Sequence, residues 1–197
     1  MNTLGPSARG SRQLGLALVA CMVLLMWVGE AVDLVPGVDL DQYGLRPRDP
    51  DGLVGIGTSP FLHAGFGHLA SNTIPFLLMG FVIALGGAMR VLLVTAIVAL
   101  VGGLGTWLLA PGATLHVGAS GLVFGYAGYL LSRGFFNRRV LDLAVALVVA
   151  LVWGGGLLVG LLPQAGVSWQ GHLFGAVGGV VAGRVLAPSR EAGGIGA

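Results

Sequence analysis

The sequence predicts an all-α membrane protein with six transmembrane helices. Hydrophobic residues make up 55% of the 197 residues and charged residues only 9%, and the mean hydropathy is +0.91. This composition excludes an ordinary soluble domain. The apolar residues also fall into six segments, and each gap between them holds glycine, proline or arginine. Both observations favour a bundle of membrane-spanning helices.

The first apolar segment runs from Leu14 to about Val35 and follows a polar N-terminal tail, residues 1–13, which we expect in the cytoplasm. Its length and the lack of an Ala-x-Ala site favour a transmembrane helix over a cleaved signal peptide. An extended loop, residues 36–62, comes next and is rich in glycine, proline and aspartate. We expect this loop on the outer side, partly in the membrane interface.

Five further apolar segments complete the predicted six-helix domain, residues 14–187, before a flexible C-terminal tail, residues 188–197. They cover residues 63–85, 91–109, 118–132, 140–162 and 169–187. The fourth span of the six is the shortest. At about 1.5 Å per residue it extends roughly 22 Å, against a hydrocarbon core of roughly 30 Å. We therefore expect a short central fourth helix whose first residues lie below the membrane surface.

Arginine residues predict how the helices are oriented. All ten basic residues are arginines, and eight of them border gaps on one side of the predicted bundle. Because basic residues favour the cytoplasmic side, both termini should be cytoplasmic. The second, fourth and sixth helices then run from outside to inside. Read as topology signals, the arginines do not indicate a nucleic-acid partner, and the lack of lysine favours a bacterial plasma membrane.

Polar side chains gather near the outer ends of these three helices. Ionisable residues inside a membrane are costly and point to function. Three histidines, one serine and one asparagine at the same depth therefore predict a site in the outer half of the bilayer. The five are His63, His68, Asn72, Ser120 and His172.

The residue types at this site suit nucleophilic catalysis. Ser120 occupies the first turn of its helix, where backbone N–H groups lack acceptors and the helix dipole is positive. Its hydroxyl needs a base, and His172 lies at the same depth. His68 and Asn72 share a helix face and can donate hydrogen bonds to a developing negative charge. Close packing of the fourth and sixth helices is favoured by a glycine at every fourth position of the sixth: Gly171, Gly175, Gly179 and Gly183.

Three motifs resemble the signatures of the rhomboid intramembrane serine proteases, in the same order and on the second, fourth and sixth spans. They are His63-x4-His68-x3-Asn72, Gly118-Ala119-Ser120-Gly121, and Gly171-His172 followed by Gly175. The resemblance covers residues from about 36 to 187.

The resemblance implies a rhomboid-like bundle with a Ser–His dyad: Ser120 as nucleophile and His172 as general base. It also implies an oxyanion hole formed by the Ser120 N–H, His68 and Asn72, and no metal or other cofactor. The expected substrates are transmembrane segments of membrane proteins within the lipid bilayer. They would be cleaved through an acyl-enzyme with water entering from the outer side. His63, His116, Gly118, Phe124 and Gly175 are the further residues expected to line or border the site.

The chain departs from the family pattern at two places. Relatives usually have tyrosine four residues after the serine, where this chain has Phe124; the ring that stacks on the histidine is kept. A Trp-Arg pair common in the outer loop is absent, and Leu53-Val54-Gly55 stands in that region. Arg46-Pro47-Arg48 is a partial substitute.

Alternative interpretations remain. His116 could replace His172 as the base, although no helix fixes it, and a role in lining the substrate cleft is favoured. A metal site formed by His63, His68 and His172 is conceivable, but the sequence has no His-Glu-x-x-His motif and no acid in these helices to act as a base. The alternative function is a non-catalytic rhomboid-like protein that binds transmembrane helices, although inactive relatives generally lose the serine or the histidine. The fifth helix, with Gly154-Gly155-Gly156, is a candidate for a moving gate.

Overall fold

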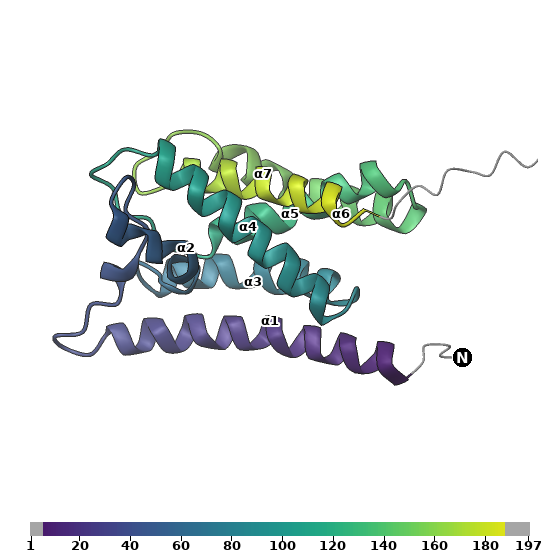
Figure 1. Cartoon of the computed structure of the whole chain (residues 1–197), viewed down its shortest axis with the longest axis horizontal. Coiled ribbons are helices and arrows are strands. Elements are labelled where there is room, and N and C mark those ends of the chain that lie inside the picture. The colour runs from purple at the N-terminus through teal and green to yellow at the C-terminus, as the bar shows by residue number, and fades with distance from the viewer. Residues whose placement is uncertain (1–5, 188–197) are drawn as a thin grey trace, which may run out of the picture.

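The computed structural model describes residues 6–187, and in this range the chain is helical with no β-strand (Figure 1). The predicted all-α class is confirmed. One helix, α2, is a single turn, and the others are 17 to 28 residues long. Their bounds are α1 Pro6–Asp33, α2 Gly55–Thr58, α3 Phe66–Ala84, α4 Ala88–Leu109, α5 Ser120–Asn137, α6 Val140–Gly160 and α7 Trp169–Val185.

Four of these helices, α1, α3, α4 and α6, are long and apolar enough to cross a membrane. The chain is therefore a multi-pass membrane protein, as its composition predicts. α5 and α7 do not reach the same threshold. α7 has only 17 residues, and α5 contains serine, arginine and asparagine, which lower its hydropathy.

The helix boundaries follow sequence signals. Gly65 and Gly87 precede α3 and α4 with φ of +105° and +95°, a left-handed region that favours glycine. Ser168 caps α7, because its Oγ accepts a hydrogen bond from the Gly171 N–H. These three residues fix where α3, α4 and α7 begin.

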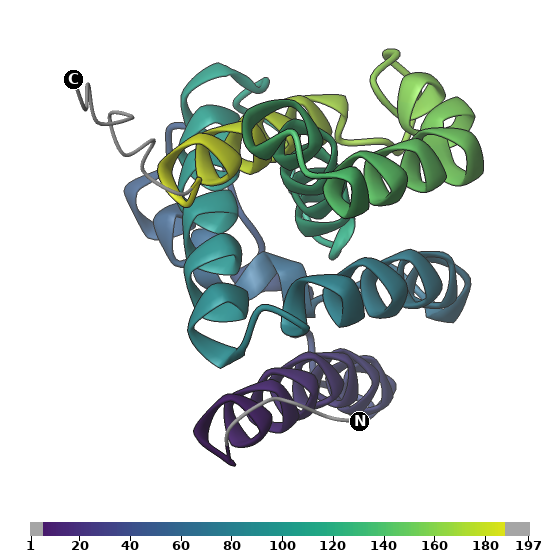
Figure 2. The ribbon, with the colours of Figure 1, turned by 90° about the vertical axis from the view of Figure 1, so that its right-hand side faces the viewer.

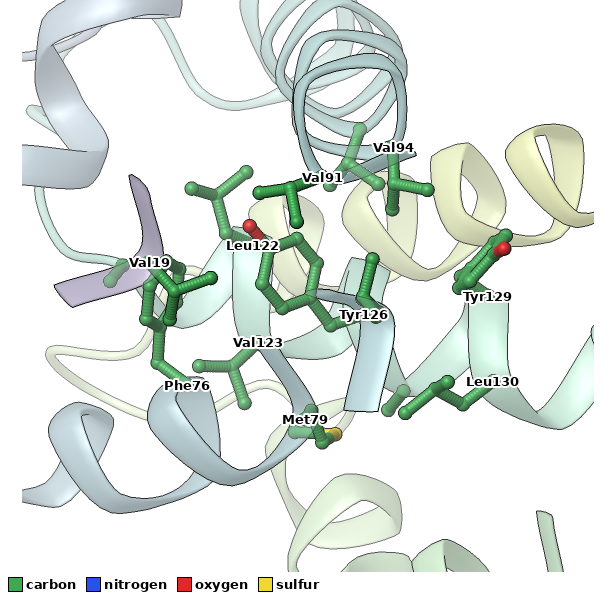
Figure 3. Packing of buried hydrophobic residues seen from close by; sticks show 14 of the residues in the cluster. Val19, Phe76, Met79, Val91, Val94, Leu122, Val123, Tyr126, Tyr129 and Leu130 are labelled. Atoms are coloured by element: carbon green, nitrogen blue, oxygen red, sulfur yellow. The ribbon is translucent and has the colours of Figure 1, made fainter. Parts of the chain in front are cut away.

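Helix α5 packs against α3, α4, α6 and α7, with its apolar side chains in the core of the molecule. Tyr126 and Tyr129 are fully buried there, and Figure 3 shows Tyr126 among side chains of α3 and α4. The Tyr126 ring stacks on Phe76 with centroids 5.1 Å apart. Its hydroxyl lies 2.6 Å from Thr95 Oγ1, so the polar end is satisfied as well.

Glycines bring α5 and α7 into backbone contact. A Cβ added at Gly175 or Gly179 would overlap the carbonyl oxygen of Gly121 or Gly125, respectively. The same addition at Gly183 would overlap Ser132 Oγ. Successive turns of α7 therefore lie directly on α5, which is the close approach that the glycine spacing predicts.

Helix α5 is longer than the 118–132 segment predicted from hydropathy. It continues to Asn137, and 18 residues correspond to about 27 Å. The extension is held by α6: Arg133 forms an ion pair with Asp142 at 3.1 Å, and Asn137 Nδ2 donates to Asp142 Oδ2 at 2.8 Å. Arg133 therefore lies inside the helix, and not at its end.

The N-terminal end of the chain differs from the predicted division into a tail and a first helix. α1 begins at Pro6, so most of the predicted tail, residues 1–13, belongs to the first turns of this helix. The predicted C-terminal tail, residues 188–197, lies outside the described residues.

The extended loop 36–62 contains α2 and three short 3-10 helices, Asp41–Tyr43, Pro50–Val54 and Ser59–Phe61. It lies at the same end of the molecule as the loop between α4 and α5, on the left in Figure 1. A pair of backbone hydrogen bonds joins Leu45 to His116 of that loop.

The two arginines of the loop also anchor it, each through different partners. Arg48 donates to the Ala110 carbonyl at 2.7 Å, at the end of α4. Arg46 donates to Asp49 Oδ2 at 2.7 Å, and this hydrogen bond holds the pKa of the Asp49 carboxyl below its usual value. The Asp49 carbonyl in turn accepts from Trp107 Nε1 at 2.8 Å.

Helix α6 lies at the edge of the bundle, as does α1 (Figure 2). Only 6% of its most apolar 18-residue stretch is buried. Nothing lies within 4 Å of where a Cβ would sit at Gly154, Gly155 or Gly156. The C-terminal half of α6 is thus loosely packed around these glycines.

Candidate active site

Ser120 and His172 meet at the ends of two helices. Ser120 is the first residue of α5 and His172 lies in the first turn of α7. Ser120 Oγ is 2.8 Å from His172 Nε2, which is hydrogen-bond distance. The glycine contacts between α5 and α7 leave no side chains between the two backbones, so the hydroxyl and the imidazole can reach each other.

The His172 ring is oriented from two sides. Its Nδ1 lies 2.7 Å from the Gly160 carbonyl oxygen at the end of α6. A carbonyl only accepts hydrogen bonds, so Nδ1 carries the proton and Nε2 is left free to accept from the Ser120 hydroxyl. The Phe124 ring stacks on the imidazole with centroids 4.1 Å apart and planes 6° apart. The Ser120 hydroxyl therefore faces a ring nitrogen that carries no proton and can accept its hydrogen bond.

The turn before Ser120 is held by the two histidines that precede and open α3. The Ala119 N–H donates to His63 Nε2 at 3.2 Å. Gly118 has φ of +117°, and a Cβ there would lie 2.6 Å from His68 Cε1. Both the backbone conformation and the close histidine require glycine at this position.

A cleft of about 1050 Å³ opens beside the serine. Asn72 lines this cleft, and its buried amide nitrogen, Nδ2, has no hydrogen-bond partner among the described residues. Because helix N-termini leave N–H groups without acceptors, the Ser120 N–H is a second free donor. The sequence-predicted residues that line the cleft are His68, Asn72, His116, Ser120, Phe124 and His172.

Three residues predicted for the site lie elsewhere around it. His63 is buried behind the serine turn and lines neither the cleft nor the smaller cavity beside Ser120; its Nε2 accepts a hydrogen bond from the Ala119 N–H. Gly175 packs against Gly121 in the helix contact below the site. Gly118 borders a second, smaller cavity of about 60 Å³ behind Ser120.

His116 does not contact Ser120 as a base must. Its Nδ1 lies 2.6 Å from Ser168 Oγ, and its Nε2 lies 2.8 Å from Thr114 Oγ1. Burial lowers the pKa of His116, so the neutral ring is favoured. With both ring nitrogens engaged, the geometry does not support His116 as the base.

Sequence reasoning missed two groups that matter here. Ser168 precedes a predicted helix, which is the usual signal of an N-cap, so the sequence contained a clue to it. Gly160 contributes a backbone carbonyl, which every residue type possesses, so no sequence signal could identify it.

Within residues 6–187, no group of three or more His, Cys, Asp or Glu side chains could hold a metal ion. The groups that this part of the chain brings together are a hydroxyl, an imidazole and hydrogen-bond donors.

Comparison with known proteins finds a matching family and similar proteins in mycobacteria. The rhomboid domain family matches residues 50–189 of the chain. An uncharacterized protein of Mycobacterium tuberculosis is 46% identical over 184 residues, which cover 88% of this chain and 76% of that protein. An uncharacterized protein of Mycobacterium leprae is 44% identical over 187 residues, which cover 90% of this chain and 73% of that protein.

Proposed function

The chain belongs to the rhomboid family, and from this premise we propose that it is an intramembrane serine endopeptidase that cleaves transmembrane segments of membrane proteins. The single observation that carries the proposal is the 2.8 Å contact between Ser120 Oγ and His172 Nε2 beside an open cleft. Active serine hydrolases need a nucleophile, a base in hydrogen-bond reach and a group that orients the base. Here the orienting group is the Gly160 carbonyl.

The reaction begins when Ser120 Oγ attacks the scissile carbonyl carbon while His172 Nε2 takes the hydroxyl proton. The Ser120 N–H, Asn72 and His68 donate to the oxyanion that forms. His172 then gives the proton to the leaving amine as the C–N bond breaks, which leaves an acyl-enzyme at Ser120. A water molecule from the cleft, deprotonated by His172, hydrolyses the ester and restores the serine.

A transmembrane substrate must leave the lipid and extend beside Ser120, because a helix keeps its carbonyls in hydrogen bonds. We propose that it enters beside α6, whose C-terminal half is loosely packed. A cysteine cross-link between the outer ends of α6 and α3 should then stop cleavage of a transmembrane substrate. Continued cleavage by the cross-linked protein would exclude this route.

The six-span arrangement belongs to the same proposal. α5 and α7 count as the two remaining spans, with the site in the outer half of a bacterial plasma membrane and both termini in the cytoplasm. The arginines on one side of the bundle support this orientation.

Labelling with a serine-directed fluorophosphonate in detergent tests the proposal, because the probe reacts only with an activated serine. We expect the wild type to label, His116→Ala to label more slowly, and Ser120→Ala and His172→Ala to remain unlabelled. Cleavage of a transmembrane peptide should follow the same pattern. Labelling that survives in His172→Ala and disappears in His116→Ala would transfer the role of base to His116.

The alternative is a non-catalytic member of the family that binds transmembrane helices. Such a protein has no use for a hydroxyl and imidazole held 2.8 Å apart. It would retain a peptide through purification, leave it intact and show no labelling of Ser120.

A further inference from the structure

A second serine–histidine contact lies next to the first. His116 Nδ1 is 2.6 Å from Ser168 Oγ, and Ser120 Oγ is 2.8 Å from His172 Nε2. Both contacts join residues 52 apart in the sequence, and each member of one pair is four residues from a member of the other. Two side-chain contacts therefore join the segment leading into α5 to the start of α7. The histidine comes from the α5 segment in one contact and from α7 in the other.

The hydrogen bonds around His116 form one consistent chain. The Gly171 N–H donates to Ser168 Oγ at 3.3 Å, so the Ser168 hydroxyl is free to donate to His116 Nδ1. His116 Nε2–H then donates to Thr114 Oγ1 at 2.8 Å, and the Thr114 hydroxyl donates to the Pro111 carbonyl at 2.6 Å. Every hydroxyl and ring nitrogen is used when His116 is neutral and carries its proton on Nε2.

The backbone of His116 is fixed too. Its N–H donates to the Leu45 carbonyl at 2.9 Å, and its carbonyl accepts from the Leu45 N–H at 3.0 Å. On the other side, the Ser168 carbonyl accepts from the His172 N–H at 3.0 Å. One imidazole thus connects the outer loop and the serine segment to the turn of α7 that carries His172.

We propose that His116 is a positioning residue, which holds Ser120 and His172 in register through its hydrogen bond to Ser168. The inference rests on the proposed protease function. Misplacement of reacting groups by about 1 Å can cost roughly 100-fold in rate. Glycine packing brings the two helices together, but it leaves the short segment before Ser120 without a side-chain tie to α7. The His116–Ser168 bond supplies that tie.

The test compares His116→Phe, which keeps a ring and loses both hydrogen bonds, with His116→Asn, whose Oδ1 can accept from Ser168 near the position of Nδ1. We expect His116→Phe to lower kcat and the rate of fluorophosphonate labelling about 10-fold or more, with KM changed less than about twofold. His116→Asn should restore most of the rate. The double variant His116→Phe/Ser168→Ala should be no slower than Ser168→Ala alone, because the two residues act through one bond.

The inference is overturned if His116→Phe keeps the wild-type kcat and labelling rate. It is also overturned if Phe and Asn lose activity equally, or if the two losses in the double variant add. Failure of the wild type itself to label or cleave would refute the proposed function instead.

The hydrogen bond between His116 and Ser168 can also be tested by spectroscopy, independently of activity. In ¹⁵N spectra of histidine-labelled protein, His116 should be protonated on Nε2 and His172 on Nδ1. Ser168→Ala should shift the His116 Nδ1 signal and leave its Nε2 protonated. A His116 signal that does not respond to Ser168→Ala would refute the bond.

Discussion

At the scale of single residues, Asn72 is unusual because folding alone gives it no partner. Its Nδ2 is buried and unpaired among the described residues, and such a group costs roughly 1–3 kcal/mol. A donor left free beside a cleft and a nucleophile is suited to a charge that appears only during reaction. In the proposed reaction, Asn72 Nδ2 is therefore free to donate a hydrogen bond to the oxyanion.

Asn72→Ala should lower kcat about 10- to 100-fold, because one donor to the oxyanion is lost. KM and thermal stability should change little, since the amide nitrogen makes no hydrogen bond in the resting site. Peptide cleavage kinetics together with a melting curve measure both. Thr73→Ala is a matched control on the same helix turn, because Thr73 faces Trp27 of α1. If Asn72→Ala keeps full kcat, the amide is not part of the oxyanion hole.

Asp41 predicts a pH effect on stability. Burial, followed by repulsion from Asp33, Glu30 and Asp39, raises the pKa of Asp41 from 3.8 to about 6. The folded state therefore binds this proton more tightly than the unfolded state. That stabilisation is full below about pH 4 and is lost as the pH rises through 6.

Asp41→Asn should accordingly stabilise the protein at pH 7.5, by on the order of 1 kcal/mol after screening by water. The gain should vanish near pH 4, where Asp41 is already protonated. Thermal unfolding in detergent at both pH values measures it. Asp51→Asn, at an exposed position, controls for simple loss of a negative charge, and an equal gain from it would contradict the prediction.

Whether the sequence could predict a site residue depends on whether that residue contributes a distinctive side chain or a feature of the folded backbone and packing. Ser120 and His172 stand out because side chains with this chemistry are rare inside apolar helices. The Gly160 carbonyl and the unpaired state of Asn72 depend on how three helices meet, which local sequence does not encode. His116 shows a further limit, because the sequence identified it and only the coordinates revealed Ser168 as its partner.

At the scale of helices, the contact between α5 and α7 determines the site. Gly179 lies against the Gly125 carbonyl with no room for a Cβ. Gly179→Ala should push the helices apart and destabilise the protein by roughly 1–3 kcal/mol, the usual cost of overpacking. Fluorophosphonate labelling should fall as well, since Ser120 and His172 separate.

Gly155→Ala provides the matched control on α6. A Cβ there meets nothing within 4 Å, and alanine is the better helix former. Stability and labelling should stay at wild-type level or rise slightly. A Gly179→Ala protein that melts and labels like Gly155→Ala would show that the backbone contact is not needed.

Helix positions were predictable from hydropathy, and their ends less so. The glycine before α4 and the serine before α7 act locally, so these starts are visible in the sequence. The end of α5 is different: Arg133 reads as an interfacial residue, yet its pairing with Asp142 of α6 lets the helix continue to Asn137. An ion pair with the next helix thus accompanies an extension that the local signal did not predict.

At the scale of the whole molecule, the predicted orientation can be measured with single cysteines. Tyr43 lies in the outer loop and Arg138 between α5 and α6. A charged maleimide should label Tyr43→Cys in intact cells and Arg138→Cys only after permeabilisation. The wild type, whose Cys21 lies within α1, should remain unlabelled. The reverse pattern would invert the topology.

The hydrogen bond from His172 to the Gly160 carbonyl has a kinetic consequence. Aspartate-assisted hydrolases stabilise the imidazolium with a full negative charge, whereas a peptide dipole offers only a partial one. An anion would also be expensive to keep beneath the headgroups. Because the resting site holds no full negative charge to stabilise the imidazolium, we expect a modest kcat. The Gly160 carbonyl belongs to α6. If α6 moves outward to admit a substrate, this carbonyl moves with it and no longer aligns the imidazole. The peptide bond can then be cleaved only after α6 has returned.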